Sequence, residues 1–176
     1  FEWGDTINSQ STAPCGVPFV DSSLGQDSCP PIPDLVKRWA EYFETGWQKE
    51  IEEMGYQEPE YASTGLIDVF IANTGCNGGT WCELSSNLAG LTSTYCDGVF
   101  QWCTAQDASY ILVNKNSQVN TTAPHELFHV LQFAYDSDGQ WYDSDVWWME
   151  ATATWMEDHV FDATNDYYSD IHRWVQ

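Results

Sequence analysis

Residues 121–135 read TTAPHELFHVLQFAY, a pattern typical of an amphipathic helix. Thr121 or Thr122 is suited to cap its N-terminus, and Pro124 fits its first turn. Apolar residues recur through the segment at helical spacing, and the turn-forming DSDG that follows should end the helix near Tyr135. The sequence therefore predicts one helix here that packs against the core and presents polar side chains on another face.

The same helix carries two histidines. His125 and His129 are four residues apart, so their side chains leave one helix face a turn apart. Imidazoles at this spacing can converge on one metal ion with Zn–N distances of about 2.0–2.1 Å. Glu126 stands next to the first histidine and can reach a metal-activated water instead of the metal. The HExxH pattern therefore predicts one catalytic zinc ion, with Glu126 as general base.

A catalytic zinc ion needs a third protein ligand and an open position for water. The longer pattern HExxHxxGxxH does not continue here, because Gln132 stands at its Gly position and Tyr135 at its last His position. We expect the ligand to be Glu150, within WWMEATATWMED at residues 147–158, on a second helix that folds back antiparallel. Glu157, two turns along nearly the same face, is the alternative ligand or an outer partner of a ligand histidine.

The run from HELFH to WWMEATATWMED resembles the zincin metallopeptidases, specifically the gluzincin group, in which a downstream Glu completes a His-His-Glu site. It is also similar to secreted bacterial metalloproteases of that broad group, and the resemblance covers roughly residues 108–157. The resemblance implies zinc-dependent hydrolysis of peptide bonds by a metal-activated water. It also implies that His125, His129 and Glu150 are the metal ligands.

One position departs from that group. Thermolysin-like enzymes have an Asp four residues after the ligand Glu, where it supports a ligand histidine, whereas this chain has Thr154. The support should therefore come from another carboxylate, and the candidates are Glu157, Asp158 and Asp145. In similar enzymes a Tyr or His after the third ligand stabilises the oxyanion. The candidates for that role here are Tyr167, Tyr168 and His172.

The remaining pattern predicts a small sheet with helices on one face. A long amphipathic helix over about 34–54 should have Asp34 as its N-cap and should stop at Gly55. The other expected elements are buried strands at 66–72 and 108–114, an edge strand at 88–95, and helices at about 146–160 and 166–175. This order predicts an α+β fold: a zincin-like small mixed sheet with a backing helix, the HExxH helix and a following Glu-bearing helix.

We expect two parts, a Cys- and Pro-rich N-terminal arm at 1–33 and a zincin-like catalytic domain at 34–176. Few residues follow Glu150, which is short for the C-terminal lobe of a gluzincin. A truncated C-terminus and an oxyanion donor outside this chain therefore stay open.

The composition bears on partners and location. Five Lys and Arg against 27 Asp and Glu give a formal net charge of −22, which argues against nucleic acid as a partner. No apolar run approaches the length of a membrane span. The six cysteines all lie within the first 103 residues, an even number that predicts disulfides and a secreted protein. Spacing leaves the pairing open, although short loops favour Cys15–Cys29, Cys76–Cys82 and Cys96–Cys103.

These observations favour a secreted endopeptidase that acts on an extended peptide or protein substrate. The edge strand at 88–95 would hold the substrate by strand addition. An aminopeptidase of the same architecture is one alternative. A non-catalytic metal-binding or interaction module that keeps the fold is another, although Glu126 argues against it because a general base has no role in simple metal retention.

Overall fold

The computed structural model describes residues 33–59, 66–72, 84, 87–94, 109–135, 146–165 and 168. The predicted order of helix, strand, edge strand, strand, helix and helix is confirmed within these residues. The elements are the helices α1 (Asp34–Trp47), α2 (Val119–Tyr135) and α3 (Val146–Val160), a π-helix η1 (Gln48–Glu53), and the strands β1 (Asp68–Ala72), β2 (Gly90–Thr94) and β3 (Ser109–Asn114). The α+β fold class is therefore correct. The N-terminal arm at 1–32, all six cysteines and nearly all of the helix expected at 166–175 lie outside the described residues.

The three strands form a mixed sheet in the order β1-β3-β2. β1 runs parallel to β3, whereas β2 runs antiparallel to it on the other side. The segment expected as an edge strand is confirmed as one within the described sheet, with bounds of Gly90–Thr94 instead of 88–95. Because β3 is central, side chains on its two neighbours that pair with one residue of β3 share that residue's face of the sheet.

One face of the sheet is buried and the other is partly exposed. In β3 the residues Ser109, Ile111 and Val113 are buried, and the residues between them are less so. This alternation is what a strand covered on one face requires. The covered face joins apolar side chains of α1 and α2 in one core cluster: Val36, Trp39, Phe43, Val69, Ile71, Ile111, Val113, Val119, Ala123, Leu127 and Val130.

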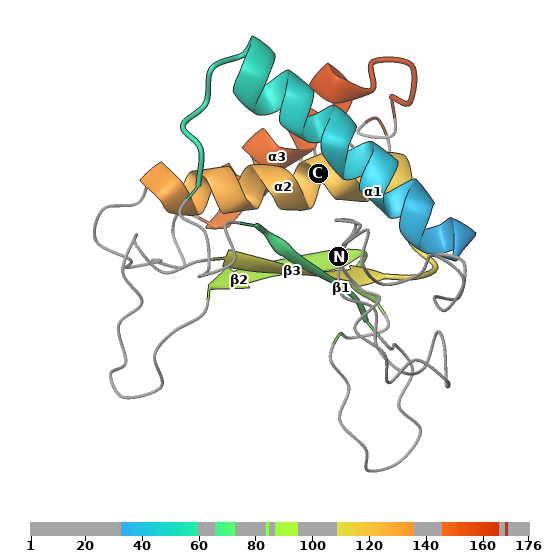
Figure 1. The fold of residues 1–176 in the computed structure, drawn as a ribbon. Helices are drawn as coiled ribbons and strands as arrows, with labels where there is room; N and C mark the ends of the chain where they lie inside the picture. The colour runs from blue at the N-terminus through green and yellow to red at the C-terminus, as the bar shows by residue number, and fades with distance from the viewer. Residues whose placement is uncertain are drawn as a thin grey trace, which may run out of the picture.

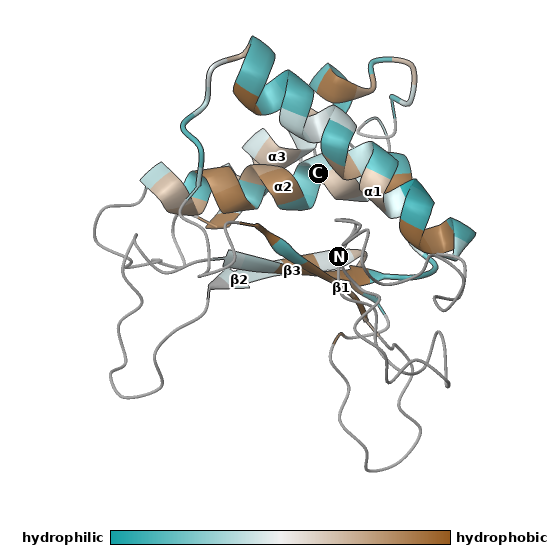
Figure 2. Ribbon diagram, in the orientation of Figure 1, coloured by the Kyte–Doolittle hydropathy of each residue, from teal (hydrophilic) through white to brown (hydrophobic). Residues whose placement is uncertain are grey.

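The three helices lie on the same side of the sheet, with α2 running directly over it (Figure 1). α2 contacts α1, α3, β2 and β3, so it is the central element of the fold. Its colouring in Figure 2 is correspondingly apolar, whereas α1 is hydrophilic along its outer side. A second cluster joins η1, α2 and α3 through Ile51, Phe128, Leu131, Ala153 and Met156. The helix that carries both histidines is therefore packed between the sheet and the other helices.

The N-terminal helix differs from the prediction in two ways. Asp34 is the first helical residue and not the N-cap, a place that Pro33 takes without any side-chain cap. The carbonyl oxygen of Pro33 accepts the first hydrogen bond of the helix, from Lys37 N at 3.1 Å. The predicted helix over 34–54 changes at Gln48 into a π-helix, with Met54 N donating to Lys49 O at 3.0 Å. Gly55, with φ of 77°, ends the helix as predicted.

The start of α2 also differs from the prediction. The helix begins at Val119, so Thr121 and Thr122 lie inside it and Pro124 falls beyond the first turn. The backbone amides of both threonines bond to Gln118 O, and Thr121 Oγ1 donates to the same oxygen at 3.3 Å. The earlier start brings Val119 into the core cluster. Burial of this side chain is the physical reason that the helix begins before the threonines.

Candidate metal centre

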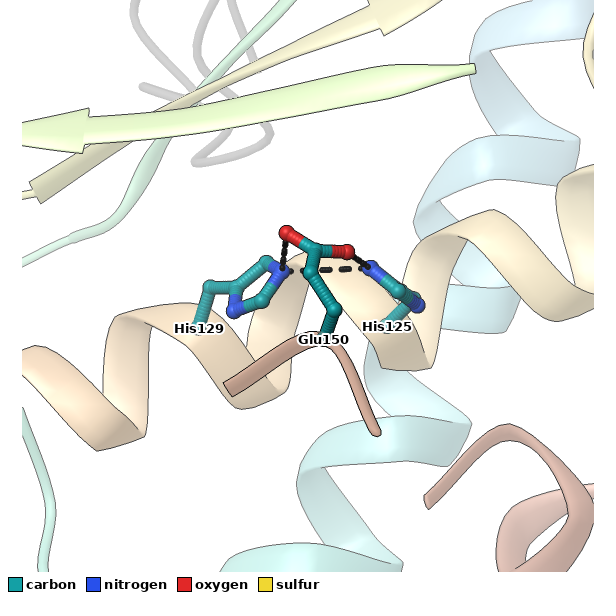
Figure 3. Close-up of side chains that lie close together, drawn as sticks. All are labelled: His125, His129 and Glu150. Atoms are coloured by element: carbon teal, nitrogen blue, oxygen red, sulfur yellow. Dashed lines mark hydrogen bonds and ion pairs between the residues drawn. The ribbon is translucent and has the colours of Figure 1, made fainter. Parts of the chain in front are cut away.

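Helices α2 and α3 bring three ionisable side chains together. His125 Nε2 and His129 Nε2 lie 3.1 Å apart. The carboxylate of Glu150 on α3 faces both rings, with Oε2 at 3.2 Å from His125 Nε2 and Oε1 at 3.5 Å from His129 Nε2 (Figure 3). The two histidine side chains are 16% and 9% exposed, whereas Glu150 is 53% exposed. The group is therefore fixed on its α2 side and open on its α3 side.

The geometry of this group suits a metal ion. Its three ligand atoms lie within 4.8 Å of one another. Ligands placed about 2.0–2.1 Å from a zinc ion at tetrahedral corners are separated by roughly 3.3–3.4 Å. The two Nε2 atoms are 3.1 Å apart, and each approaches a different oxygen of Glu150, Oε2 at 3.2 Å from His125 and Oε1 at 3.5 Å from His129. Small shifts of these side chains would give two imidazoles and one carboxylate the spacing that zinc requires, and the same donor set also suits other divalent first-row metals.

Glu157 stands behind His125. Its Oε1 lies 2.5 Å from His125 Nδ1, on the side of the ring opposite to Glu150. Its side chain is only 13% exposed. A carboxylate that accepts a hydrogen bond from Nδ1–H turns Nε2 toward a metal and makes Nε2 more basic. The structure thus brings Glu150 to the Nε2 atoms and Glu157 to the back of one ring, and Glu157 is the only one of the three expected supporting carboxylates seen in such a position among the described residues.

The second histidine has a partner that the sequence reasoning missed. Gln132 Oε1 lies 2.7 Å from His129 Nδ1. The amide nitrogen of Gln132 donates to Met149 O at 3.1 Å and to Thr152 Oγ1 at 2.8 Å. Because a backbone carbonyl only accepts, these bonds fix the amide with its oxygen toward His129. Nδ1 must then carry the proton, which leaves His129 Nε2 as the atom that faces Glu150.

The pKa values of His125 and Glu150 are both shifted strongly from their ordinary values. Burial alone would lower the pKa of His125, but hydrogen bonds to Glu150 and Glu157 outweigh it and raise that pKa to about 10. Hydrogen bonds to His125 and His129 hold the pKa of Glu150 far below its ordinary value. The imidazole of His125 is thus protonated at neutral pH and lies between the carboxylates of Glu150 and Glu157. A metal ion would replace that proton, because metals bind neutral imidazole.

Glu126 lies on the β2 side of the same helix. It is 5% exposed, and the hydroxyl of Thr92 donates to its Oε2 at 2.8 Å. Burial raises its pKa, whereas the charges of His125 and His129 and the hydrogen bond from Thr92 lower it. A carboxylate that sits beside the histidines without joining their ligand group is placed as a general base would be.

The structure describes two of the other predicted site residues, and neither belongs to this group. Tyr168 is 59% exposed and is not one of the three residues brought together. Asp158 has one buried carboxyl oxygen without a hydrogen-bond partner in the described part of the chain, and the hydrogen bonds of His125 and His129 seen there do not involve it. Tyr167, His172 and Asp145 lie outside the described residues.

An apolar cavity of about 420 Å³ opens beside the site, between α2, α3 and the segment after η1. Phe128 and Leu131 line it from α2, and Trp148 and Met149 line it from α3. Gln132, which holds His129, also contributes to its wall. The cavity is large enough to receive one apolar side chain next to the candidate metal centre.

Comparisons with known proteins give no relative for this arrangement: no family model, no curated protein and no solved structure matches the chain. Among the described helices, none has the length and apolar character to cross a membrane.

Proposed function

We propose that this chain is a zinc-dependent peptidase. The observation that carries the proposal is the convergence of His125, His129 and Glu150 within 4.8 Å, with Glu126 buried on the same helix beside them. Two histidines and a glutamate are a donor set known from catalytic zinc sites, which keep one position open for water. The exposed side of Glu150 supports such an open position.

A zinc ion in this site would act as a Lewis acid that makes water nucleophilic near neutral pH. His125 and His129 would hold it through Nε2, and Glu150 through its carboxylate. Glu157 and Gln132 would keep the two rings in orientation from behind. Glu126 would take the proton from the attacking water and later deliver it to the leaving amine. Its raised pKa supports the second half of that role.

The substrate proposed is an extended peptide. β2 stands at the edge of the described sheet beside Glu126, where an added strand would lie close to the site. An endopeptidase is the activity that this arrangement supports best, and an aminopeptidase of the same architecture is the alternative. An oxyanion donor among Tyr167, Tyr168 and His172 stays a prediction.

The test combines metal analysis with cleavage of an internally quenched peptide library. We expect about one zinc ion per chain, cleavage that a chelator blocks, and recovery when zinc is added back. Cleavage inside peptides whose N-termini are blocked would separate an endopeptidase from an aminopeptidase. If the protein bound no transition metal, the proposal of a zinc-dependent peptidase would be rejected. A protein that binds zinc and cleaves nothing would be the non-catalytic module.

We also propose that the protein is secreted and disulfide-bonded. The six cysteines among the first 103 residues support this. All six should be oxidised in the mature protein, which mass spectrometry after alkylation with and without reduction would measure. Several free thiols would reject the proposal.

A further inference from the structure

Strand β2 packs against the candidate general base through two residues. Thr92 pairs with Ile111 and Gly90 with Val113, so both lie on the face of the sheet that the helices cover. Thr92 Oγ1 lies 2.8 Å from Glu126 Oε2 and 2.9 Å from the backbone carbonyl oxygen of Glu126. One hydroxyl group thus touches both the side chain and the main chain of the same residue.

Gly90 supplies the space for this contact. A Cβ atom built on Gly90 would stand 2.6 Å from both Cγ and Cδ of Glu126. Such a separation is far inside van der Waals contact, so any larger residue would force the Glu126 side chain to another position. The absence of a side chain at 90 and the hydroxyl at 92 act on the same carboxylate from neighbouring positions along one strand.

We infer that Gly90 and Thr92 form a seat on β2 that positions the general base Glu126 for the proton transfer. Thr92 is a positioning residue, since it acts through Glu126 and not on the substrate. The inference rests on the proposed function for what Glu126 does. The seat also links two parts of the site, because β2 is the edge strand of the described sheet that we expect to bind substrate, and its inner face holds the base.

The decisive variants are Thr92→Val, which keeps the shape and removes the hydroxyl, and Thr92→Ser, which keeps the hydroxyl. With a quenched peptide that the wild-type protein cleaves, Thr92→Val should lower kcat roughly 10–100-fold, the range for loss of a group that orients a reacting residue. KM and zinc affinity should stay near wild type, and Thr92→Ser should restore most of kcat. On a Glu126→Gln background, Thr92→Val should have no further effect.

Thr45 on α1 provides a matched control for the same substitution. Its hydroxyl donates to Glu41 O on its own helix at 2.7 Å, away from the site, so Thr45→Val should leave kcat unchanged. Gly90→Ala should lower kcat in the same way as Thr92→Val. If Thr92→Val kept wild-type kcat, or if it lowered zinc affinity as much as kcat, the positioning role would be rejected.

A second readout does not depend on turnover. In crystal structures of the zinc-loaded variants, Glu126 should leave its position in Thr92→Val and Gly90→Ala but keep it in Thr92→Ser, with the histidines unmoved in all three. A wild-type protein without peptidase activity would overturn the proposed function alone. An unmoved Glu126 in Thr92→Val and Gly90→Ala would overturn the seat alone.

Discussion

Two buried glutamates lie at helix α2, Glu126 on the helix itself and Glu50 on the neighbouring η1, and they differ in their hydrogen bonding. Glu126, toward β2, is 5% exposed and receives a hydrogen bond from Thr92. Glu50 comes from η1 on the α1 side, is fully buried, and neither of its carboxyl oxygens has a hydrogen-bond partner among the described residues. Its Oε1 lies 3.4 Å from the position that a Cβ on Gly46 would take, where α1 also approaches Leu127 and Pro124 of α2.

Burial raises the pKa of both carboxyl groups, so the difference lies in what opposes it. At Glu126 the charges of two histidines and a hydrogen bond act against burial. At Glu50 only the charge of His125 does, and its pKa stays well above the ordinary value. A partnered carboxyl group can exchange a proton with its surroundings, whereas an unpartnered one keeps its proton and costs stability. The comparison therefore separates the proposed general base from a carboxyl group that weakens the fold.

The largest expected effect separates the two glutamates directly. Glu126→Gln should lower kcat by roughly 10²–10⁴-fold, because it removes the base without removing a ligand. Zinc content and thermal stability should stay near wild type. Glu50→Gln is the matched control, and it should leave kcat unchanged. Kinetics on a quenched peptide with parallel metal analysis would measure this, and a Glu126→Gln variant with near-normal turnover would contradict the mechanism.

The carboxylates of α3 extend the comparison to metal affinity. Glu150→Ala removes a proposed ligand and should weaken zinc binding more than Glu157→Ala, which removes only the partner of His125 Nδ1 and should cost roughly 10–100-fold. Zinc dissociation constants measured by competition with a chromophoric chelator would rank the two. The reverse order would make Glu157 the ligand.

Zinc binding should also depend on pH in a defined direction. Because the pKa of His125 is raised to about 10, its imidazole is protonated at neutral pH and must lose that proton to bind metal. Affinity should therefore rise about tenfold per pH unit at neutral pH and level off above the pKa of His125. Calorimetric titrations in buffers of different ionisation enthalpy should detect about one proton released per zinc bound. If no proton were released, or if affinity did not change with pH, the ring would be neutral before binding.

The approach of the two histidines to each other could be predicted because helical spacing is a local property of the sequence. Two histidines at i and i+4 share a helix face in any α-helix, and their spacing survives the error of three or four residues in where α2 begins. Glu150 required only that the next helix fold back. Thr92 and Gln132 could not be found in this way, because a threonine on an edge strand and a glutamine on a helix are ordinary residues until tertiary contacts bring them to a carboxylate and a ring.

On the α1 side, the sequence did not predict the burial of Glu50 for a different reason. Glu50 lies seven residues after Phe43 and four after Gly46, both buried, so helical spacing points it inward. Residue type points the other way, since an unpaired glutamate is almost never fully buried. The change from α-helix to π-helix at Gln48 adds a wider turn that no sequence pattern indicated. Where spacing and residue type disagree, the sequence alone does not decide between them.

The smallest expected effect tests the cost of Glu50. Replacement by Met keeps a similar volume and removes two buried oxygens without partners, so the free energy of unfolding at neutral pH should rise by about 1–3 kcal/mol.

The ionisable carboxyl group of Glu50 also makes the stability of the wild-type protein depend on pH. The pKa of Glu50 is raised in the folded state, so above the ordinary carboxyl value of about 4.3 the unfolded chain loses its proton while the folded chain keeps it. Wild-type stability should therefore fall as pH rises above that value, relative to a Glu50→Gln variant whose amide does not titrate. Urea unfolding of the wild type and the Gln variant at pH 4 and pH 7 would measure the difference, which should be larger at pH 7. Equal differences at the two pH values would mean that Glu50 ionises as readily in the folded protein as in the unfolded chain, and the contrast with Glu126 would lose its basis.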